Sequence, residues 1–81
     1  MILIEPVTSE KVLRMIELEN KIVFVVKRNA KKPEIKKELE QTFKVKVQRI
    51  NTYIRDNKKI ALIKLKKETP AIEIATKLGM M

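Results

Sequence analysis

The 81-residue chain is predicted to adopt an α+β fold, in which helices pack on a mainly antiparallel sheet of three or four strands. Three observations favour this class. One apolar run rich in β-branched residues lies between two segments with helical periodicity, two strand-like segments flank a short polar turn, and a further helical segment follows them. The expected order is helix, strand, helix, strand, strand, helix, within a single domain over residues 1–81.

The first helix is expected to start after a hydroxyl cap at Thr8 and to run to about Leu18. Val7 and Val12 have the spacing of a hydrophobic staple across that start. An apolar stripe continues along the same segment, which is typical of a helix that packs on a sheet.

The first strand is expected at Ile22–Val26, an unbroken apolar run. A run of this kind is typical of a strand that is covered on both faces, so we expect it at the centre of the sheet. The segment Ile2–Glu5 is the candidate for an additional edge strand.

The main helix is expected to start with Pro33 at its first position. An amide proton at that position would have no acceptor within the helix, so its absence in proline costs no hydrogen bond. Ile35, Leu39 and Phe43 recur every four residues and form one apolar face. Charged side chains fill the other faces of this segment, so the helix is predicted to be amphipathic.

Two strands, Val45–Arg55 and Lys59–Lys66, are expected to form a hairpin joined at the polar turn Asp56–Lys58. The apolar positions of the first of these strands change parity midway. A one-residue bulge near Gln48 or Arg49 would bring them back to a single inward face.

The last helix is predicted to have Thr69 as its N-cap and Pro70 as its first residue, and to end at Gly79. Its apolar stripe consists of Ala71, Ile74, Ala75 and Leu78.

The charge of the chain is unevenly distributed. Nineteen Lys or Arg against ten Asp or Glu give +9 overall. Residues 27–67 hold fifteen of the basic and four of the acidic residues, a net +11, which leaves −2 for the remainder. This polarity predicts one side that binds a polyanion and another that is free for different contacts.

Most catalytic chemistry is excluded by composition, because the chain has no Cys, no His and a single Gly. The carboxylate pairs Glu17–Glu19 and Glu38–Glu40 diverge on a helix, so we interpret them as solvated rather than as acid and base. A small phosphatase site using Arg28 and Asn51 is the enzymatic alternative, disfavoured by the lack of a glycine-rich loop. We expect no enzyme activity, no cofactor and no metal.

Basic residues interleaved with strand apolars, and a second basic cluster before the main helix, favour nucleic acid as the partner. RNA is preferred over DNA because the basic surface is a sheet edge with loops rather than a recognition helix. For Tyr53 we favour packing over base stacking, and for Asn51 and Thr52 local pairing and RNA contact stay equally open.

The order of short motifs resembles the universal large-subunit ribosomal protein family twenty-three. The motifs that carry this resemblance are Pro6–Lys11, Asn20, Ile22–Val26, Ala30–Lys36, Phe43–Val47, Ile50–Thr52 and Lys59–Leu65. The long basic hairpin loop of bacterial members and the N-terminal arm of eukaryotic members have no counterpart here, so the compact form is most similar to archaeal members. Lys31 and Ile60 depart from the family pattern.

The resemblance implies a cytoplasmic protein of the ribosome that binds large-subunit rRNA near the polypeptide tunnel exit, beside other ribosomal proteins. It also implies a docking platform for the signal recognition particle, nascent-chain-associated factors or the translocon, with Glu10 facing them and no membrane insertion. A non-ribosomal basic nucleic-acid-binding module is the alternative. The candidate RNA contacts are Lys27, Arg28, Lys31, Lys32, Lys36, Lys46, Arg49, Asn51, Thr52, Tyr53, Arg55, Lys58, Lys59, Lys64 and Lys66.

Overall fold

The computed structural model describes residues 2–79, which form a four-stranded antiparallel sheet with three helices. The strands are β1 (Leu3–Pro6), β2 (Lys21–Val26), β3 (Val47–Arg55) and β4 (Lys58–Leu65), and the helices are α1 (Glu10–Glu19), α2 (Lys32–Phe43) and α3 (Ala71–Lys77). The strand order across the sheet is β1-β2-β4-β3. The predicted fold class and element order are confirmed, and β1 is the additional edge strand.

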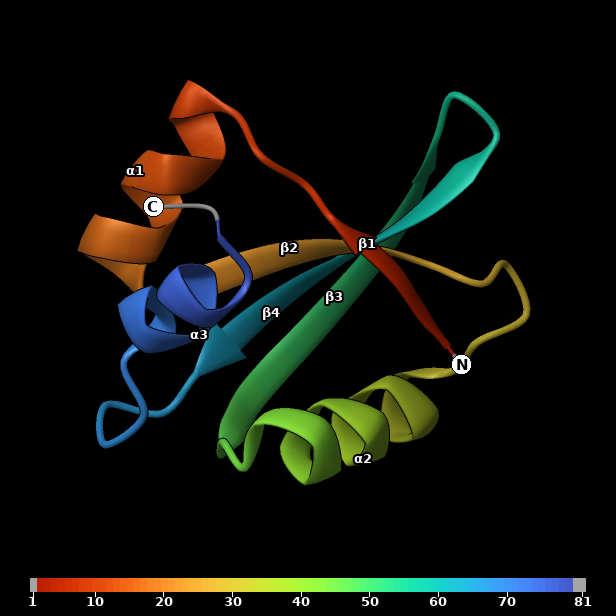
Figure 1. Ribbon diagram of the computed structural model, residues 1–81. Helices are drawn as coiled ribbons and strands as arrows, with labels where there is room; N and C mark the ends of the chain where they lie inside the picture. Colours follow the sequence, from red (N-terminus) through yellow and green to blue (C-terminus); the bar gives the residue numbers. More distant parts are fainter. Residues whose placement is uncertain (1, 80–81) are drawn as a thin grey trace.

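The helices leave one end of the sheet free (Figure 1). α2 lies across one face, where the rings of Phe24 and Phe43 approach with centroids 6.3 Å apart. α1 and α3 lie together at the end where β2 begins (Figure 1). The loop after β2 and the β3–β4 turn therefore lie at the opposite end, away from α1 and α3.

The strand β2 is central, between β1 and β4, as predicted. Ile22–Val26 are all buried, with exposed fractions of 8% or less. Alternate residues of this strand face opposite sides of the sheet, so both sides must be covered. The side of Phe24 is covered by α2, and the side of Val23 is partly covered by α1.

The predicted bulge in β3 is present. Val47 pairs with Leu65 and Arg49 pairs with Lys64, which leaves Gln48 without a partner. One extra residue reverses the alternation of side chains beyond it. The apolar residues on both sides of the bulge consequently face α2 together.

The start of β3 differs from the prediction, whereas its predicted end at Arg55 is confirmed. The strand begins at Val47 rather than Val45, because Lys44 ends α2 in the left-handed conformation with φ 54° and the chain then needs two residues to enter the sheet. At the other end, Ile54 is 54% exposed, since the hairpin extends past the cover of α2. The inward face of β3 thus stops before the turn.

The hairpin turn consists of two residues rather than three. Asp56 and Asn57 have φ values of 50° and 66°, the pattern of a type I′ turn. Lys58 already belongs to β4, which ends at Leu65, so both ends of this strand lie one residue earlier than predicted. The tight turn matches the right-handed twist of its two strands.

α1 is capped by Ser9, not by Thr8 as predicted. The Ser9 hydroxyl accepts a hydrogen bond from the Val12 amide at 3.2 Å. The Val7 amide donates to the Val23 carbonyl at 2.9 Å, which prolongs the pairing beyond β1. This bond delays the start of the helix by one residue, so Val7 and Val12 do not have the staple spacing about the actual cap.

α2 begins at Lys32, one residue before the prediction, and Pro33 occupies its second position, where an amide proton is also not required. Ile35 and Leu39 are fully buried and Phe43 is half-buried, which confirms the predicted apolar face. No helix among residues 2–79 is long and apolar enough to cross a membrane.

Two carboxylates of α2 are not solvated, contrary to the prediction. Glu38 is half-buried and accepts the amide of Leu3 at 2.7 Å and that of Ile2 at 3.0 Å. Glu40 is also half-buried and accepts the Val47 amide at 3.0 Å. Each one ties α2 to a strand at the edge of the sheet, so neither side chain is available for acid or base chemistry.

The side chain of Asn20 connects α1 to the start of α3. Its Nδ2 group donates to three carbonyls between Leu65 and Thr69 at 3.0–3.2 Å. Its Oδ1 atom accepts the Ala71 amide at 2.6 Å. Asn20 itself is left-handed with φ 55°, a conformation that Asn tolerates better than most residues.

The start of α3 also differs from the prediction, because the helix begins at Ala71 with Pro70 at the N-cap. The predicted cap, Thr69, instead accepts the Lys46 amide through its hydroxyl at 3.3 Å. Gly79 follows the helix with φ 72°, as expected for a left-handed helix end.

Candidate nucleic-acid interface

The two basic segments predicted from sequence meet at the free end of the sheet. The Lys59 ammonium donates to the Ala30 carbonyl at 2.6 Å and to the Arg28 carbonyl at 3.4 Å. The Arg28 guanidinium also reaches the side chain of Asn57 in the hairpin turn at 3.5 Å. These contacts hold the loop after β2 against the hairpin, although they are about thirty residues apart in the chain.

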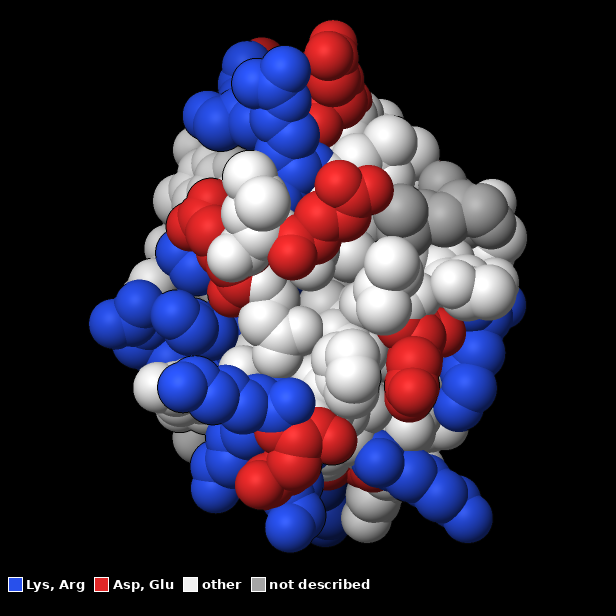
Figure 2. Space-filling view, turned by 90° about the vertical axis from the view of Figure 1, so that its left-hand side faces the viewer, with Lys and Arg blue, Asp and Glu red and all other residues white. Residues whose placement is uncertain are grey.

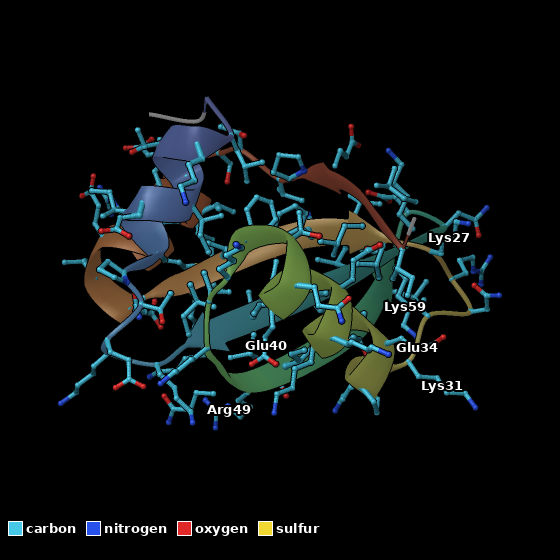
Figure 3. All side chains as sticks on the ribbon, turned by 60° about the horizontal axis from the view of Figure 1, so that its bottom comes forward. Lys27, Lys31, Glu34, Glu40, Arg49 and Lys59 are labelled. Carbon is cyan, nitrogen blue, oxygen red and sulfur yellow. The ribbon has the colours of Figure 1, made fainter. Side chains whose placement is uncertain are left out.

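This end therefore carries one concentrated group of cations, which we name the tip cluster. In Figure 3, Lys27, Lys31 and Lys59 lie at the same end of the molecule, and Arg49 lies toward the other. All members except Lys59 are exposed. The tip cluster comprises Lys27, Arg28, Lys31, Lys32, Arg55, Lys58 and Lys59.

Lys59 has a structural task within the tip cluster. Its side chain is half-buried and two of its three N–H donors are directed at carbonyls of the loop. The ammonium thereby provides hydrogen bonds to two main-chain carbonyls and fixes the position of the neighbouring cations. Lys58, in contrast, is exposed and lies 4.0 Å from Glu5, a distance at which an exposed ion pair contributes little.

A second feature is a row of polar side chains along β3, which is an edge strand. Arg49, Asn51, Tyr53 and Arg55 alternate with residues of the other face and are all exposed. Successive members are two residues apart, or roughly 7 Å in an extended strand. We name these four residues the β3 row; Arg55 also belongs to the tip cluster, so the two features are continuous.

The structure separates Asn51 from Thr52. Asn51 is exposed and belongs to the β3 row, whereas Thr52 is half-buried on the face toward α2, opposite Ala61. No side-chain hydrogen bond of either residue is found within residues 2–79. Only Asn51 is therefore placed beside the other candidate RNA contacts of this strand.

Three cations lie side by side where the β3 row begins. Lys64 on β4 pairs in register with Arg49 on one side and with Lys21 of β2 on the other. Glu19 lies 3.2 Å from Lys21. Within residues 2–79, neither Arg49 nor Lys64 has a carboxylate within 4.0 Å. Like charges placed opposite each other are destabilising, so this site favours an anion.

Lys21 is not among the candidate contacts predicted from sequence. The residue lies outside the basic segment, and its place beside Lys64 depends on the register of β2 against β4. Charge counting along the chain could not find it. Pairing the hydrophobic faces of the two central strands is the signal that could have done so.

The remaining candidates are spread over other parts of the surface. Lys46 lies at the end of the hairpin opposite to the tip cluster. Its ammonium is 3.7 Å from a carboxylate oxygen of Glu68, and its carbonyl accepts a hydrogen bond from the Lys66 amide at 2.9 Å. Lys36 is exposed on α2. The structure thus groups most candidates along β3 and at the tip, and leaves Lys36, Lys46 and Lys66 apart.

Arg28 and Asn51, the residues of the phosphatase alternative, do not converge on one site. Arg28 lies beyond the end of β2, next to the hairpin turn, whereas Asn51 pairs with Leu62 in the middle of the sheet. Val26, the last residue of β2, and Ile54 of β3 both pair with Lys59 of β4. Asn51 lies three residues before Ile54, so the backbone of Arg28 is at least roughly 10 Å from that of Asn51 along the strand direction. The Arg28 guanidinium is directed at Asn57 in the turn and not at Asn51.

The side formed by α1 and α3 has a different character. Figure 2 looks onto this side and shows acidic side chains among surface without Lys or Arg, which lie around much of its edge. Glu10 is exposed in the first turn of α1, 3.7 Å from Arg14. Leu18 and Ile72 are 81% and 44% exposed. The charge polarity expected from sequence is therefore also a polarity of the folded surface.

Comparison with known proteins agrees with this architecture. Residues 1–76 match the family model described as ribosomal protein L23. The chain is also 46% identical over 79 residues to the large ribosomal subunit protein uL23 of Thermoplasma acidophilum, an alignment that covers 98% of this chain and 94% of that protein. Proteins of this family are structural parts of a ribonucleoprotein rather than enzymes, and their partners are rRNA and other ribosomal proteins. The chain belongs to the ribosomal protein L23 family and is a protein of the large ribosomal subunit.

Proposed function

We propose that the chain binds large-subunit rRNA near the exit of the polypeptide tunnel, through the tip cluster and the β3 row. The observation that carries this proposal is the contact of Lys59 with the Ala30 carbonyl, which joins two basic segments into one surface. Several cations held on a fixed scaffold neutralise closely spaced phosphates and release counterions. Folded RNA, which is recognised mainly by shape and backbone, fits such a surface of strand edge and loops.

Arg49 and Lys64, which have no carboxylate within 4.0 Å in the described part of the chain, support the same assignment. Their neighbours in the sheet are other cations, and a phosphate placed above them would replace repulsion by attraction. Their position continues from the β3 row, so one RNA backbone can follow the strand from this site to the tip cluster.

Charge reversal tests this proposal. The double variants Lys31→Glu/Lys32→Glu and Lys64→Glu/Lys66→Glu should bind cognate large-subunit rRNA more weakly and with a smaller dependence on salt, by roughly 0.7–0.9 in the log–log slope for each phosphate that the protein no longer neutralises. The control, Arg14→Glu/Lys77→Glu, changes the net charge equally on the side of α1 and α3. Equal reductions of affinity in all three variants would leave only a non-specific effect of net charge.

The side of α1 and α3 is proposed to form the docking platform for factors that meet the nascent chain. Exposed Glu10 and the exposed apolar residues Leu18 and Ile72 support this, because a mixed acidic and apolar surface repels RNA and suits a protein partner. The partners proposed from the family are the signal recognition particle, nascent-chain-associated factors and the translocon.

Ribosomes that carry Glu10→Lys test the docking proposal. They should assemble normally and lose affinity for one of these factors, whereas Glu17→Lys, an equal charge change roughly 10 Å further along α1, should have a smaller effect. Unchanged binding of all three factors to the Glu10→Lys ribosomes would contradict the assignment of this residue.

A further inference from the structure

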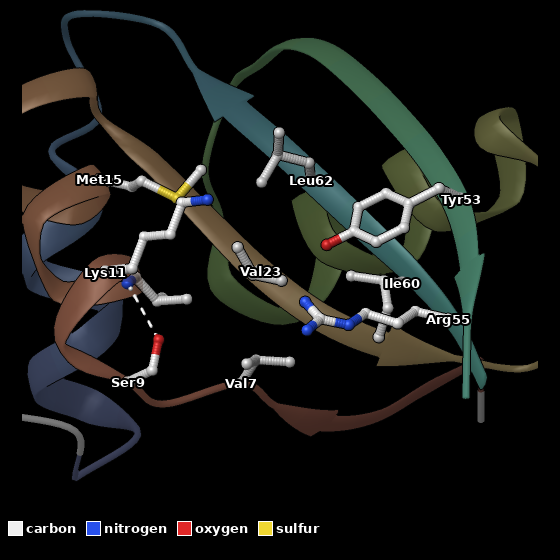
Figure 4. Close-up of a pocket in the computed structure, with 10 residues that line it drawn as sticks. Val7, Ser9, Lys11, Met15, Val23, Tyr53, Arg55, Ile60 and Leu62 are labelled. Carbon is white, nitrogen blue, oxygen red and sulfur yellow. Dashed lines mark hydrogen bonds between the residues drawn. The ribbon is translucent and has the colours of Figure 1, made fainter. Parts of the chain in front are cut away.

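The face of the sheet opposite α2 is only partly covered and contains a groove. α1 lies over one side of this face, and β3 borders the other (Figure 4). The hollow between them has a volume of about 320 Å³. Its floor consists of Val23, Ile60 and Leu62 from the two central strands.

The walls of the groove are amphipathic. Tyr53 and Arg55 extend from β3 toward the floor on one side, and Lys11 and Met15 project from α1 on the other (Figure 4). Tyr53 is 46% exposed, and its cross-strand partner is the floor residue Ile60. Among residues 2–79, none that lines the groove is acidic. The groove thus combines an apolar floor, an exposed aromatic ring and two cations.

We propose that this groove binds one unpaired nucleobase of the RNA. The inference rests on the proposed rRNA-binding function and adds a specific subsite to it. The ring of Tyr53 and the apolar floor would contact the faces of the base, and the cations Lys11 and Arg55 would meet the phosphates on either side of it. Aromatic side chains commonly receive bases that are splayed out of folded RNA, and every base has a π-face for such a contact.

The size of the groove favours a single nucleotide. Its volume is at the lower end of the range for small-molecule sites, whereas a helix of a partner protein is about 10–12 Å across and would extend far beyond it. Tyr53 and Arg55 also belong to the β3 row, so a base in the groove would be continuous with the RNA backbone along that strand.

The charges favour RNA over an apolar peptide. An apolar peptide that filled the groove would cover Lys11 and Arg55 and supply no counter-charge, and none of the lining residues within 2–79 has a carboxylate to supply one. A nucleotide brings its own phosphates next to both cations. One nucleotide would therefore contact the apolar floor with its base and both cations with its phosphates.

The test compares Tyr53→Ala with Ile54→Ala, the next residue of β3, which is similarly exposed on the opposite face of the strand. Binding to transcribed cognate large-subunit rRNA should weaken roughly 5- to 150-fold in Tyr53→Ala, the range expected when one base loses its aromatic partner. The salt slope should stay unchanged because the substitution removes no cation from the site. Tyr53→Phe, which keeps the ring, and Ile54→Ala should bind like the wild type.

The outcomes separate this subsite from the wider RNA-binding proposal. Wild-type affinity of Tyr53→Ala, with the charge-reversal variants still impaired, would overturn the base subsite alone. If the wild-type protein shows no preference for rRNA, the wider proposal fails and the subsite with it.

Ultraviolet cross-linking of the wild-type complex adds an independent readout. A nucleotide attached to Tyr53, Lys11 or Met15, identified by mass spectrometry, supports the subsite. A complex in which none of the groove residues is cross-linked, while residues of the tip cluster are, contradicts it. Perturbation of the groove methyl groups in NMR spectra by an apolar peptide, and not by rRNA fragments, would assign the groove to a protein ligand instead.

Discussion

The ammonium of Lys59 lies 2.6 Å from the carbonyl oxygen of Ala30, so the last strand of the hairpin holds the loop that precedes α2. This contact adds to the pairing of Val26 with Lys59 and to the Arg28–Asn57 bond, which also hold the two basic segments together. With it, the cations around the loop keep fixed positions relative to those of the hairpin. A rigid arrangement of positive charges loses less entropy on binding a folded polyanion.

Lys59→Met should weaken this arrangement. The variant keeps the length of the side chain and removes its bonds to two carbonyls, and we expect a loss of about 1–2 kcal/mol in the free energy of unfolding, since hydrogen bonds to charged groups are worth slightly more than neutral ones. Urea denaturation measures the loss, and hydrogen exchange should show faster opening of residues 28–31. Lys58→Met removes the same charge from an exposed site and is the control. Equal stability of the two variants would argue against the anchoring contact.

Asn20→Ala should destabilise the fold by about 2–4 kcal/mol, because it removes four hydrogen bonds and places Ala at a positive φ. Asn20→Gly keeps the conformation and should recover only the smaller backbone part of the loss. Asn57→Ala also replaces a left-handed Asn, in an exposed turn. If thermal and urea unfolding of Asn20→Ala and Asn57→Ala gave the same loss, the side-chain bonds of Asn20 would contribute nothing measurable.

Glu38→Ala should release the N-terminal strand from α2. The carboxylate accepts the amides of Ile2 and Leu3, so its removal should cost about 1–3 kcal/mol and raise the exchange rate of those amides more than that of the central strands. Glu17→Ala, on the exposed side of α1, should have little effect. Exchange rates in β1 that match the wild type would be incompatible with this role.

Arg49→Gln should have effects of opposite sign on stability and on RNA binding. In the free protein it removes repulsion from Lys64, so the free energy of unfolding should rise by about 0.2–1 kcal/mol at low salt. Added salt should reduce this difference by screening the charges. The affinity for rRNA should fall, whereas Lys77→Gln on α3 should change neither property. A variant that is both less stable and equally tight in RNA binding would show that the repulsion is absent.

Local patterns were sufficient to predict much of the fold. The apolar run Ile22–Val26 identified the central strand, and the change of parity in the next strand identified the bulge at Gln48. Both features follow from the two-residue period of a strand and need no knowledge of distant residues. The position of the turn at Asp56 and Asn57 also follows from local sequence, and the predicted turn is one residue longer than the observed one.

Several errors occurred where a residue distant in sequence forms the hydrogen bond that was expected from a neighbouring one. Thr69 was predicted to cap α3, but its hydroxyl is bonded to the amide of Lys46, and Asn20 performs the cap from 51 residues away. Glu38 was interpreted as solvated because its partners lie in another strand. Partners this far apart in sequence can be found only when the sheet and its helices have been assembled.

The candidate interface shows the same division. Its cations could be identified from charge alone, but which of them lie together depends on contacts such as that of Lys59 with Ala30. The opposite orientation of Asn51 and Thr52 follows from strand parity and could have been predicted. The place of Lys21 beside Lys64 does not follow from charge counting, because it needs the register of β2 against β4, which the pairing of their hydrophobic faces could have supplied.

Protection of large-subunit rRNA by the purified protein tests the central proposal most directly, with unrelated structured RNA and duplex DNA as competitors at physiological salt. We predict that one rRNA segment is protected in preference to both competitors, and that Lys31→Glu/Lys32→Glu abolishes this protection while Arg14→Glu/Lys77→Glu preserves it. Equal competition by all three nucleic acids would contradict site-specific rRNA recognition by the tip cluster and the β3 row.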